Sequence, residues 1–282
     1  MPLNNSTAWN YWQDNWIAGN PGIMGPLDHG SWLGSTVFDG ARAFEGTTPD
    51  LDLHCARLIR SAVAMGLKPL HSAGELHDLC IEGVGKFPAD AELYIKPMYW
   101  AKTGFVAPDR DTTEFCLTIM EAPLPPTTGF SVCLSHYRRP TPETALTNAK
   151  AACLYPNSGR ALREAIEKGY DNAVMLDTLG HVAELASANI WMAKDGVAYT
   201  PIPNGTFLSG ITRYRIIKLF EEVGIRTVEK SLKYEDFLTA DEIFSTGNFG
   251  KVQPITRIEE RRIQPGPLFT QAKDLYRDYA HR

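Results

Sequence analysis

The spacing of apolar residues predicts two amphipathic helices near the start of the chain. Asp52 can cap a helix over 52–66, and apolar residues recur there at intervals that give one buried face: Ala56, Leu58, Ile59, Val63 and Leu67. A second helix is predicted over 74–87, with its own apolar stripe: Leu76, Leu79, Cys80 and Val84. Apolar runs of strand length follow at 92–100 (ELYIKPMYW) and 114–121 (EFCLTIME). The first part of the chain therefore combines helices with strands.

A proline-rich stretch divides the chain. Residues 122–129 (APLPPTTG) hold three prolines among their first five positions, which favours an extended linker. Beyond it the pattern predicts a helix after SGIT and these further elements: a strand at 130–135, a helix over 159–168, hairpins of 173–176 with 182–185 and 190–193 with 197–200, and strands at 226–229 and 242–245. We therefore predict two α+β domains, 1–121 and 130–282, joined by the linker.

Composition and charge exclude several classes of protein. Acidic residues outnumber basic ones, 33 to 28, so the net charge of −5 provides no basic field for nucleic acid or anionic lipid. No apolar run approaches the roughly 20 residues that span a bilayer. The N-terminus, MPLNNSTAWNYWQDNW, lacks the basic and apolar segments of a secretion signal. The five cysteines form no zinc-binding pattern, so we expect reduced, buried thiols, no metal site and a cytoplasmic protein.

Two charged residues stand among small and apolar ones. Lys150 (NAKAACLY) and Glu143 are the only charged residues between Pro140 and Gly159. Such a lysine either extends its amine to water or is held as a Schiff-base nucleophile, because desolvation lowers the pKa of an amine. Glu184 (HVAELASANIW) is either a strand-end residue with a local partner or a buried carboxylate kept ionised by a cation, such as a protonated ring nitrogen.

Three features could bind a phosphate group. SGIT at 209–212 immediately precedes a helix, whose first amides and positive end attract anions. STGN at 245–248 is a strand-to-loop turn with amide donors, and Arg57 on the first helix could add a guanidinium. An ordinary helix cap, a turn and a solvated arginine would explain the same features. The GxGxxG, P-loop, HExxH, GxSxG and SxxK patterns are absent, which argues against nucleotide sites, metalloproteases and serine hydrolases.

Seven segments follow one another along the chain: GSTVFDGARAFEG (34–46), HCARL (54–58), YIKP (94–97), NAKAACLY (148–155), ELASANIW (184–191), LSGITR (208–213) and STGN (245–248). In this order they resemble the class IV (fold-type IV) pyridoxal-phosphate aminotransferases, especially the branched-chain amino acid aminotransferase group. The resemblance covers nearly the whole chain. It implies a smaller N-terminal α/β domain, a larger C-terminal pseudo-barrel domain, and pyridoxal 5'-phosphate in the cleft between them. It also implies a homodimer in which the loop 101–110 of one copy completes the site of the other.

The resemblance assigns a role to each matching residue. It implies that Lys150 bonds covalently to the cofactor and later moves the proton of the substrate Cα. Glu184 would face the pyridine nitrogen and keep it protonated, and Tyr155 would hydrogen-bond the phenolic oxygen. The other cofactor positions would hold the phosphate or support its loops: Arg57, Asn189, Gly210, Ile211, Thr212, Gly247 and Asn248.

The chain departs from the branched-chain pattern at several positions. The substrate positions implied by the resemblance are Leu33, Phe38, Arg42, Tyr94 and Lys96. Lys96 stands where arginine is common, Leu33 where tyrosine is usual, and Asn248 where threonine is usual. Trp191 replaces a phenylalanine or tyrosine. We expect a transaminase that moves an amino group between an apolar, branched-chain-type amino acid and a 2-oxo acid. The alternatives are an (R)-selective amine or D-amino acid transaminase and, on the same fold, an aminodeoxychorismate lyase.

Overall fold

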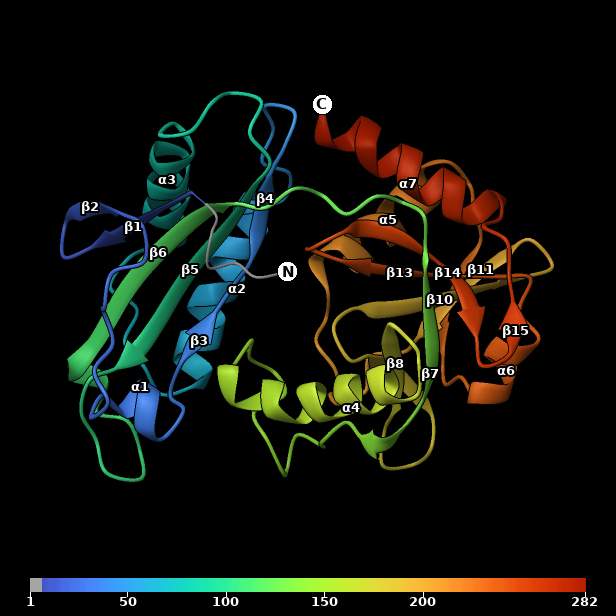
Figure 1. Cartoon of the computed structure of the whole chain (residues 1–282), viewed down its shortest axis with the longest axis horizontal. Coiled ribbons are helices and arrows are strands. Elements are labelled where there is room, and N and C mark those ends of the chain that lie inside the picture. The colour runs from blue at the N-terminus through green and yellow to red at the C-terminus, as the bar shows by residue number, and fades with distance from the viewer. Residues whose placement is uncertain (1–6) are drawn as a thin grey trace. The chain divides into compact units, whose positions relative to one another are not determined.

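The computed structural model describes residues 7–282 and contains two compact units, each with its own β-sheet (Figure 1). Unit 1 extends to Leu124 and includes Asn148–Leu154, whereas unit 2 comprises Pro125–Thr147 and Tyr155–Arg282. The domain predicted from the sequence over 130–282 includes the segment Asn148–Leu154. The segment that carries Lys150 instead packs with unit 1, because its backbone pairs with the strand that contains Phe38. The prediction that the N-terminus lacks a secretion signal concerns a stretch that begins outside the described residues.

Unit 1 holds a six-stranded sheet of order β2-β1-β6-β5-β3, with β4 also paired to β5. Its strands are β1 (Ala8–Trp12), β2 (Asn15–Ala18), β3 (Val37–Phe38), β4 (Ala41–Ala43), β5 (Leu93–Ala101) and β6 (Thr113–Glu121). Its α-helices are α1 (His29–Trp32), α2 (Leu51–Ala64) and α3 (Ala73–Val84). In Figure 1, α2 and α3 lie along the long strands β5 and β6 and pack against them. The alternate strand residues Leu93, Ile95 and Ile119 are buried.

The helices predicted over 52–66 and 74–87 are present as α2 and α3. Helix α3 begins at a capping box, in which Ser72 Oγ accepts from the Glu75 amide at 3.2 Å and the Glu75 carboxylate accepts from the Ser72 amide at 2.7 Å. The predicted buried face of α2 was wrong in part, since Val63 is 62% exposed. Its buried side carries the polar residues His54 and Arg57 instead.

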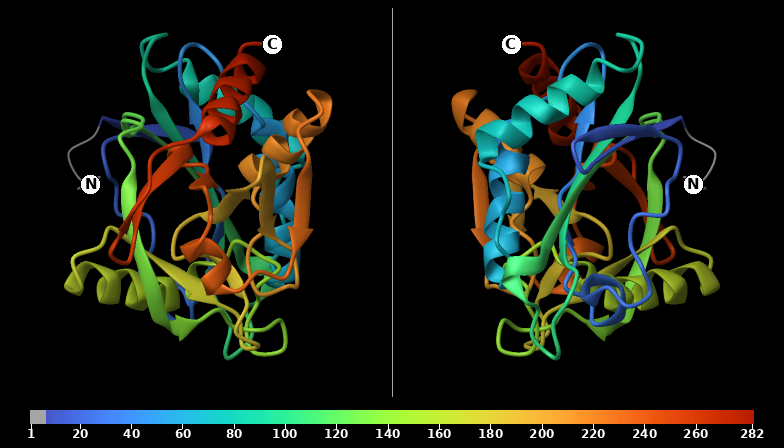
Figure 2. Two further views of the ribbon diagram at one scale, coloured as in Figure 1. Left: turned by 90° about the vertical axis from the view of Figure 1, so that its right-hand side faces the viewer. Right: turned by 90° about the vertical axis from the view of Figure 1, so that its left-hand side faces the viewer.

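Unit 2 is built on a nine-stranded sheet of order β12-β11-β10-β13-β14-β7-β8-β9, with β15 paired to β14. Its strands are β7 (Phe130–Arg138), β8 (Asn172–Leu176), β9 (Val182–Leu185), β10 (Asn189–Lys194), β11 (Val197–Pro201), β12 (Thr227–Lys230), β13 (Glu242–Gly247), β14 (Lys251–Ile258) and β15 (Arg261–Arg262). Its α-helices are α4 (Tyr155–Glu167), α5 (Ile211–Glu222), α6 (Tyr234–Leu238) and α7 (Pro267–Ala280). Helix α4 packs along β7 and β8 (Figure 2), and α5 packs against α7. The two predicted hairpins are confirmed as β8–β9 and β10–β11.

The C-terminal elements β14 and α7 were not predicted. Helix α7 starts where the carboxylate of Glu242, only 3% exposed, accepts hydrogen bonds from the amides of Leu268 at 3.0 Å and Phe269 at 2.9 Å. The first amides of a helix have no acceptor within the helix, and the Glu242 carboxylate supplies acceptors for two of them.

Four of the five cysteines are buried as expected, but Cys153 is exposed. Within residues 7–282, no helix is long and apolar enough to cross a membrane. The same part of the chain contains no group of three or more His, Cys, Asp or Glu residues placed to hold a metal ion.

Candidate active site

Lys150 lies in a segment of unit 1 whose backbone is held from two sides. Its carbonyl accepts a hydrogen bond from the Phe38 amide at 3.0 Å, and its own amide donates to Ser61 Oγ at 3.0 Å. The next residue, Ala151, forms an antiparallel bridge with Val37. The half-buried side chain places Nζ 5.0 Å from the centroid of the Phe38 ring. The backbone contacts therefore fix the position of Lys150 without involving its amine.

The predicted substrate residues Phe38, Arg42, Tyr94 and Lys96 share one face of the unit 1 sheet. Arg42 lies directly opposite Tyr94 in the β4–β5 pair, and Phe38 lies opposite Met98 in the β3–β5 pair. Directly opposed residues of antiparallel strands present their side chains on the same face. Tyr94, Lys96 and Met98 alternate along β5, so they share that face as well. It therefore combines two aromatic rings with two cations.

The cation at Arg42 is fully buried. Burial lowers the pKa of its guanidinium to about 10, although Glu92 and Tyr94 act in the opposite direction. The guanidinium therefore stays charged at neutral pH, and a charge withdrawn from water interacts strongly with a carboxylate. Leu33 differs from the other predicted substrate residues. It follows α1, lies outside these strand pairs and is 49% exposed.

The predicted phosphate ligand Arg57 belongs to a buried polar group with Asp39 and His54. The Asp39 carboxylate accepts from Arg57 Nε at 2.7 Å and from Arg57 Nη2 at 2.8 Å, and lies 2.7 Å from His54 Nδ1. It also accepts from the Gly40 amide at 2.7 Å. Burial alone would raise the pKa of Asp39. The Arg57 guanidinium and, to a smaller extent, His54 outweigh this effect, so the pKa of Asp39 lies well below its usual range. Asp39 therefore anchors one side of the guanidinium as an anion.

We expect Asp39→Asn to reduce the free energy of unfolding of the cofactor-free protein by about 3–5 kcal/mol, because it leaves the buried Arg57 charge without its anion. The stability that Asp39 contributes is present at neutral pH and is lost as the pH falls below about 4, since its folded-state pKa lies below the unfolded value. Urea denaturation measures both effects. Asp52→Asn, on the exposed side of α2, is the matched control and should change stability by less than about 1 kcal/mol. Equal stabilities of the Asp39→Asn and Asp52→Asn variants would contradict this account of Arg57.

In unit 2, Glu184 lies on β9 and is buried between two partners. Arg139 Nε lies 3.2 Å from Glu184 Oε1, and Asn189 Nδ2 donates to Glu184 Oε2 at 3.1 Å. Arg139 is held in turn by the Thr206 carbonyl at 3.1 Å and by Ser158 Oγ at 3.0 Å. The arginine thus stabilises the ionised form of the carboxylate. Glu184 therefore has local partners, one of them a cation, and its contact with a ring nitrogen stays a prediction.

The same asparagine connects Glu184 to the turn that begins α5. Asn189 Nδ2 also donates to the Leu208 carbonyl at 3.1 Å. A Cβ atom on Gly210 would lie 1.9 Å from Asn189 Oδ1, so any larger residue would push the Asn189 amide out of place. Helix α5 starts at Ile211 without a side-chain cap, which leaves its first amides available to an anion. The Asn189 and Gly210 positions therefore support a cradle formed by Ile211 and Thr212.

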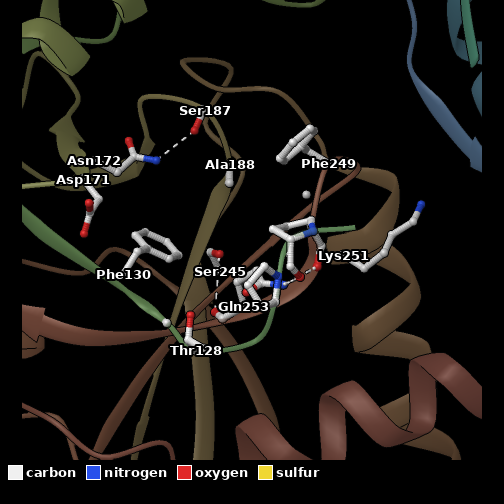
Figure 3. Close-up of a pocket in the computed structure, with 15 residues that line it drawn as sticks. Thr128, Phe130, Asp171, Asn172, Ser187, Ala188, Ser245, Phe249, Lys251 and Gln253 are labelled. Carbon is white, nitrogen blue, oxygen red and sulfur yellow. Dashed lines mark hydrogen bonds between the residues drawn. The ribbon is translucent and has the colours of Figure 1, made fainter. Parts of the chain in front are cut away.

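The β13–β14 turn carries the remaining predicted phosphate residues, Gly247 and Asn248. A Cβ atom on Gly247 would lie 3.2 Å from the Cβ of Ala188, so the turn packs closely on the loop that follows Glu184. In the structure as described, the buried Nδ2 of Asn248 has no hydrogen-bond acceptor. A pocket of about 460 Å³ adjoins this turn (Figure 3), and its lining includes Phe130, Ser187, Ala188, Ser245 and Phe249.

Two other residues singled out from the sequence occupy different surroundings. Tyr155 is the first residue of α4 and is 45% exposed. Trp191 is fully buried in the core of unit 2, stacked on Phe244 with ring centroids 5.5 Å apart and donating to Thr246 Oγ1 at 3.0 Å. Its departure from the usual residue type is therefore accommodated by core packing within unit 2.

Known proteins with the same arrangement identify the family. The sequence profile described as "Amino-transferase class IV" matches residues 36–258. An X-ray crystal structure of an aminotransferase from Brucella abortus, bound to the cofactor pyridoxal phosphate, is 49% identical, with a TM-score of 0.97 over 98% of this chain and 100% of that one. The chain belongs to the class IV aminotransferases.

Two further relatives of this class IV aminotransferase are branched-chain enzymes. A branched-chain-amino-acid aminotransferase from Pseudomonas aeruginosa is 33% identical over 270 residues, which cover 89% of this chain and 86% of that protein. A branched-chain aminotransferase from Thermoproteus uzoniensis, crystallised with norvaline, is 29% identical, with a TM-score of 0.90 over 98% of this chain and 95% of that one. The prediction of fold type IV is confirmed: unit 1 is the small N-terminal domain, and unit 2 is the larger domain with a curled half-barrel sheet. This class IV aminotransferase depends on pyridoxal phosphate.

The polar groups of this aminotransferase fit the cofactor's chemistry. In unit 2, the uncapped start of α5 and the Nδ2 of Asn248 offer donors for a phosphate group. The carboxylate of Glu184, kept ionised by Arg139, suits a protonated ring nitrogen. In unit 1, Asp39 orients the guanidinium of Arg57, a cation whose chemistry suits a phosphate group.

Several residues in these groups were not predicted from the sequence. No role was predicted for Asp39, His54, Arg139 or Lys251, although the first two stand inside the quoted segments FDGAR and HCARL. His54 and Arg57 are three residues apart on a helix, which places them on one face and was the available signal. Arg139 and Lys251 gave no such signal, because their partners lie elsewhere in the fold or across a turn.

Proposed function

We propose that this aminotransferase moves an amino group between an apolar, branched-chain-type L-amino acid and a 2-oxo acid. The observation that carries the proposal is the sheet face in unit 1, where the rings of Phe38 and Tyr94 lie with the cations Arg42 and Lys96, and Lys150 Nζ lies 5.0 Å from the Phe38 ring centroid. Aromatic rings suit an apolar side chain, whereas the cations suit the carboxylates of amino and 2-oxo acids. The names of the relatives from Pseudomonas aeruginosa and Thermoproteus uzoniensis support the same substrate class.

Pyridoxal phosphate, when bound, supplies an electron sink for the charge that develops at the substrate Cα. We assign Lys150 Nζ to covalent attachment of the cofactor and to the transfer of the Cα proton. Glu184 would hold the proton at the pyridine nitrogen, with Arg139 and Asn189 keeping its carboxylate ionised and oriented. Tyr155 would hydrogen-bond the phenolic oxygen. The phosphate would be held by Arg57, Ile211, Thr212 and Asn248.

The donor preference tests the proposed function. We expect the holoenzyme to be converted to its pyridoxamine form faster by L-leucine than by D-alanine or (R)-1-phenylethylamine. L-leucine offers both an apolar side chain for the rings and a carboxylate for Arg42 and Lys96, whereas the amine has no carboxylate and D-alanine has only a methyl group. Absorbance of the bound cofactor after rapid mixing, without an acceptor, gives the three rates. A fast reaction with (R)-1-phenylethylamine together with an inert L-leucine would overturn the proposal in favour of an amine transaminase.

We also propose that the chain forms a homodimer through the exposed apolar residues of unit 1. Phe105, in the loop 101–110 singled out by the family resemblance, is 86% exposed, and Trp32 is 70% exposed. The two residues lie on adjacent segments, because the His29 amide at the start of α1 donates to the Lys102 carbonyl at 3.1 Å. Exposed apolar side chains gathered on adjacent segments mark an association surface. Light scattering should give the mass of two chains, and Phe105→Asp should reduce it toward that of one. A single-chain mass for the unmodified protein would contradict the dimer.

A further inference from the structure

Lys251, the first residue of β14, is a buried lysine outside the predicted site. It is 7% exposed, although lysine is almost never buried without a partner. Its ammonium donates a hydrogen bond to Asn248 Oδ1 at 2.9 Å and lies 5.6 Å from the centroid of the Tyr276 ring on α7. In Figure 3 the Lys251 side chain points away from Phe130 and Ser245. The lysine thus contacts the phosphate-binding turn proposed above through Asn248.

The contact with Lys251 determines which way the Asn248 amide faces. An asparagine side chain has an oxygen that accepts and a nitrogen that donates, and the two ends can exchange places by rotation. A lysine ammonium has three donors and no acceptor, so it can face only the oxygen. Nδ2 then points elsewhere, and in the described structure it is buried with no acceptor. A buried donor without an acceptor is unfavourable, which marks the place of a ligand oxygen.

We propose that Lys251 is a positioning residue: it locks the Asn248 amide so that Nδ2 donates to the phosphate of pyridoxal phosphate. This inference rests on the proposed function only in placing the phosphate at Asn248. Without Lys251 the amide can turn its oxygen toward the phosphate, where two acceptors would repel each other. A threonine at position 248 needs no such lock, because its hydroxyl proton rotates freely to whichever acceptor is present.

This difference between asparagine and threonine provides the test, which is a double-mutant cycle of Lys251→Met and Asn248→Thr on the full chain. The readout is the ratio of affinities of the cofactor-free protein for pyridoxal phosphate and for pyridoxal, measured by absorbance titration. Because pyridoxal lacks the phosphate, the ratio reports phosphate contacts and not attachment at Lys150. We expect Lys251→Met alone to reduce the ratio about tenfold or more, as for loss of a hydrogen bond to a charged group.

In the Asn248→Thr background, the same Lys251→Met change should reduce the ratio by about threefold or less, since the hydroxyl donates without help. Lys251→Arg, which retains a donor, should restore most of the ratio where Asn248 is intact. Equal losses with and without Asn248→Thr would overturn the inference, because Lys251 would then act as a distant charge or as a structural support. An equal loss of pyridoxal binding would overturn it as well.

The failure of this inference can be distinguished from the failure of the proposed function. If Asn248→Leu leaves the affinity ratio unchanged, the phosphate does not bind at Asn248 and the role of Lys251 is refuted. L-leucine would still convert the holoenzyme to its pyridoxamine form in that case, so the proposed reaction would stand. Conversely, if L-leucine does not react, the proposed substrate is wrong. The affinity ratios still report the phosphate contact of Asn248, because they are measured without substrate.

Discussion

Lys150→Ala should still fold but lose transamination by several orders of magnitude. We assign one amine two tasks, attachment of the cofactor and proton transfer at the substrate Cα, and alanine can perform neither. Folding should persist because the contacts that position this segment are made by its backbone, with the Phe38 amide and with Ser61 Oγ. The rate of the half-reaction with L-leucine and the thermal melting temperature together measure the two expectations.

Lys96→Ala is the matched control for Lys150→Ala, because it removes a lysine from the same sheet face without removing the proposed nucleophile. Lys96→Ala should raise the KM for the substrate and leave the cofactor attached to the protein. If the Lys150→Ala variant retains turnover near that of the unmodified enzyme, another group carries out both tasks and the assignment of Lys150 is wrong.

Glu184→Gln should lower the rate of the half-reaction by about 10²-fold or more, which corresponds to at least roughly 2.7 kcal/mol at the barrier. The neutral amide cannot stabilise a proton on the pyridine nitrogen, so the electron sink weakens. Cofactor binding should weaken only modestly, because the phosphate contacts assigned to Arg57, Thr212 and Asn248 remain. Single-turnover rates with L-leucine, at measured cofactor occupancy, test this expectation.

The surface change Glu235→Gln on α6 removes one negative charge from the same unit and should leave the rate unchanged. Unchanged turnover of the Glu184→Gln variant at full occupancy would remove Glu184 from the mechanism. A rate loss that disappears when Arg139 is also replaced would show that Glu184→Gln acts only by leaving that buried cation without its partner.

Local patterns predicted α2 from its apolar spacing but misjudged its buried side. Val63 was expected in the core and is exposed, whereas His54 and Arg57 are buried around Asp39. A hydrophobic period cannot detect polar residues that are buried because they are paired. Such a conflict between local pattern and burial is expected where a fold carries a functional group.

Long-range pairing explains what else the sequence did not reveal. Lys150 follows the linker and was assigned to the second domain, yet its segment forms backbone bonds with β3, more than a hundred residues earlier. Nothing in NAKAACLY itself specifies that pairing. Strand β14 was missed for a local reason, since Pro254 interrupts its alternation. The conformation at Lys251, with a positive φ of 56°, is rare for a residue other than glycine and had no sequence signal.

The residue that carries the cofactor can be identified directly by reducing the yellow holoenzyme with borohydride and mapping its peptides. Borohydride converts the carbon–nitrogen double bond between lysine and cofactor to a stable single bond, so the attachment survives digestion. The account predicts one pyridoxyl-labelled peptide, modified at Lys150 within NAKAACLY. A label on another lysine, such as Lys96 on the substrate face or Lys251 beside Asn248, would contradict it.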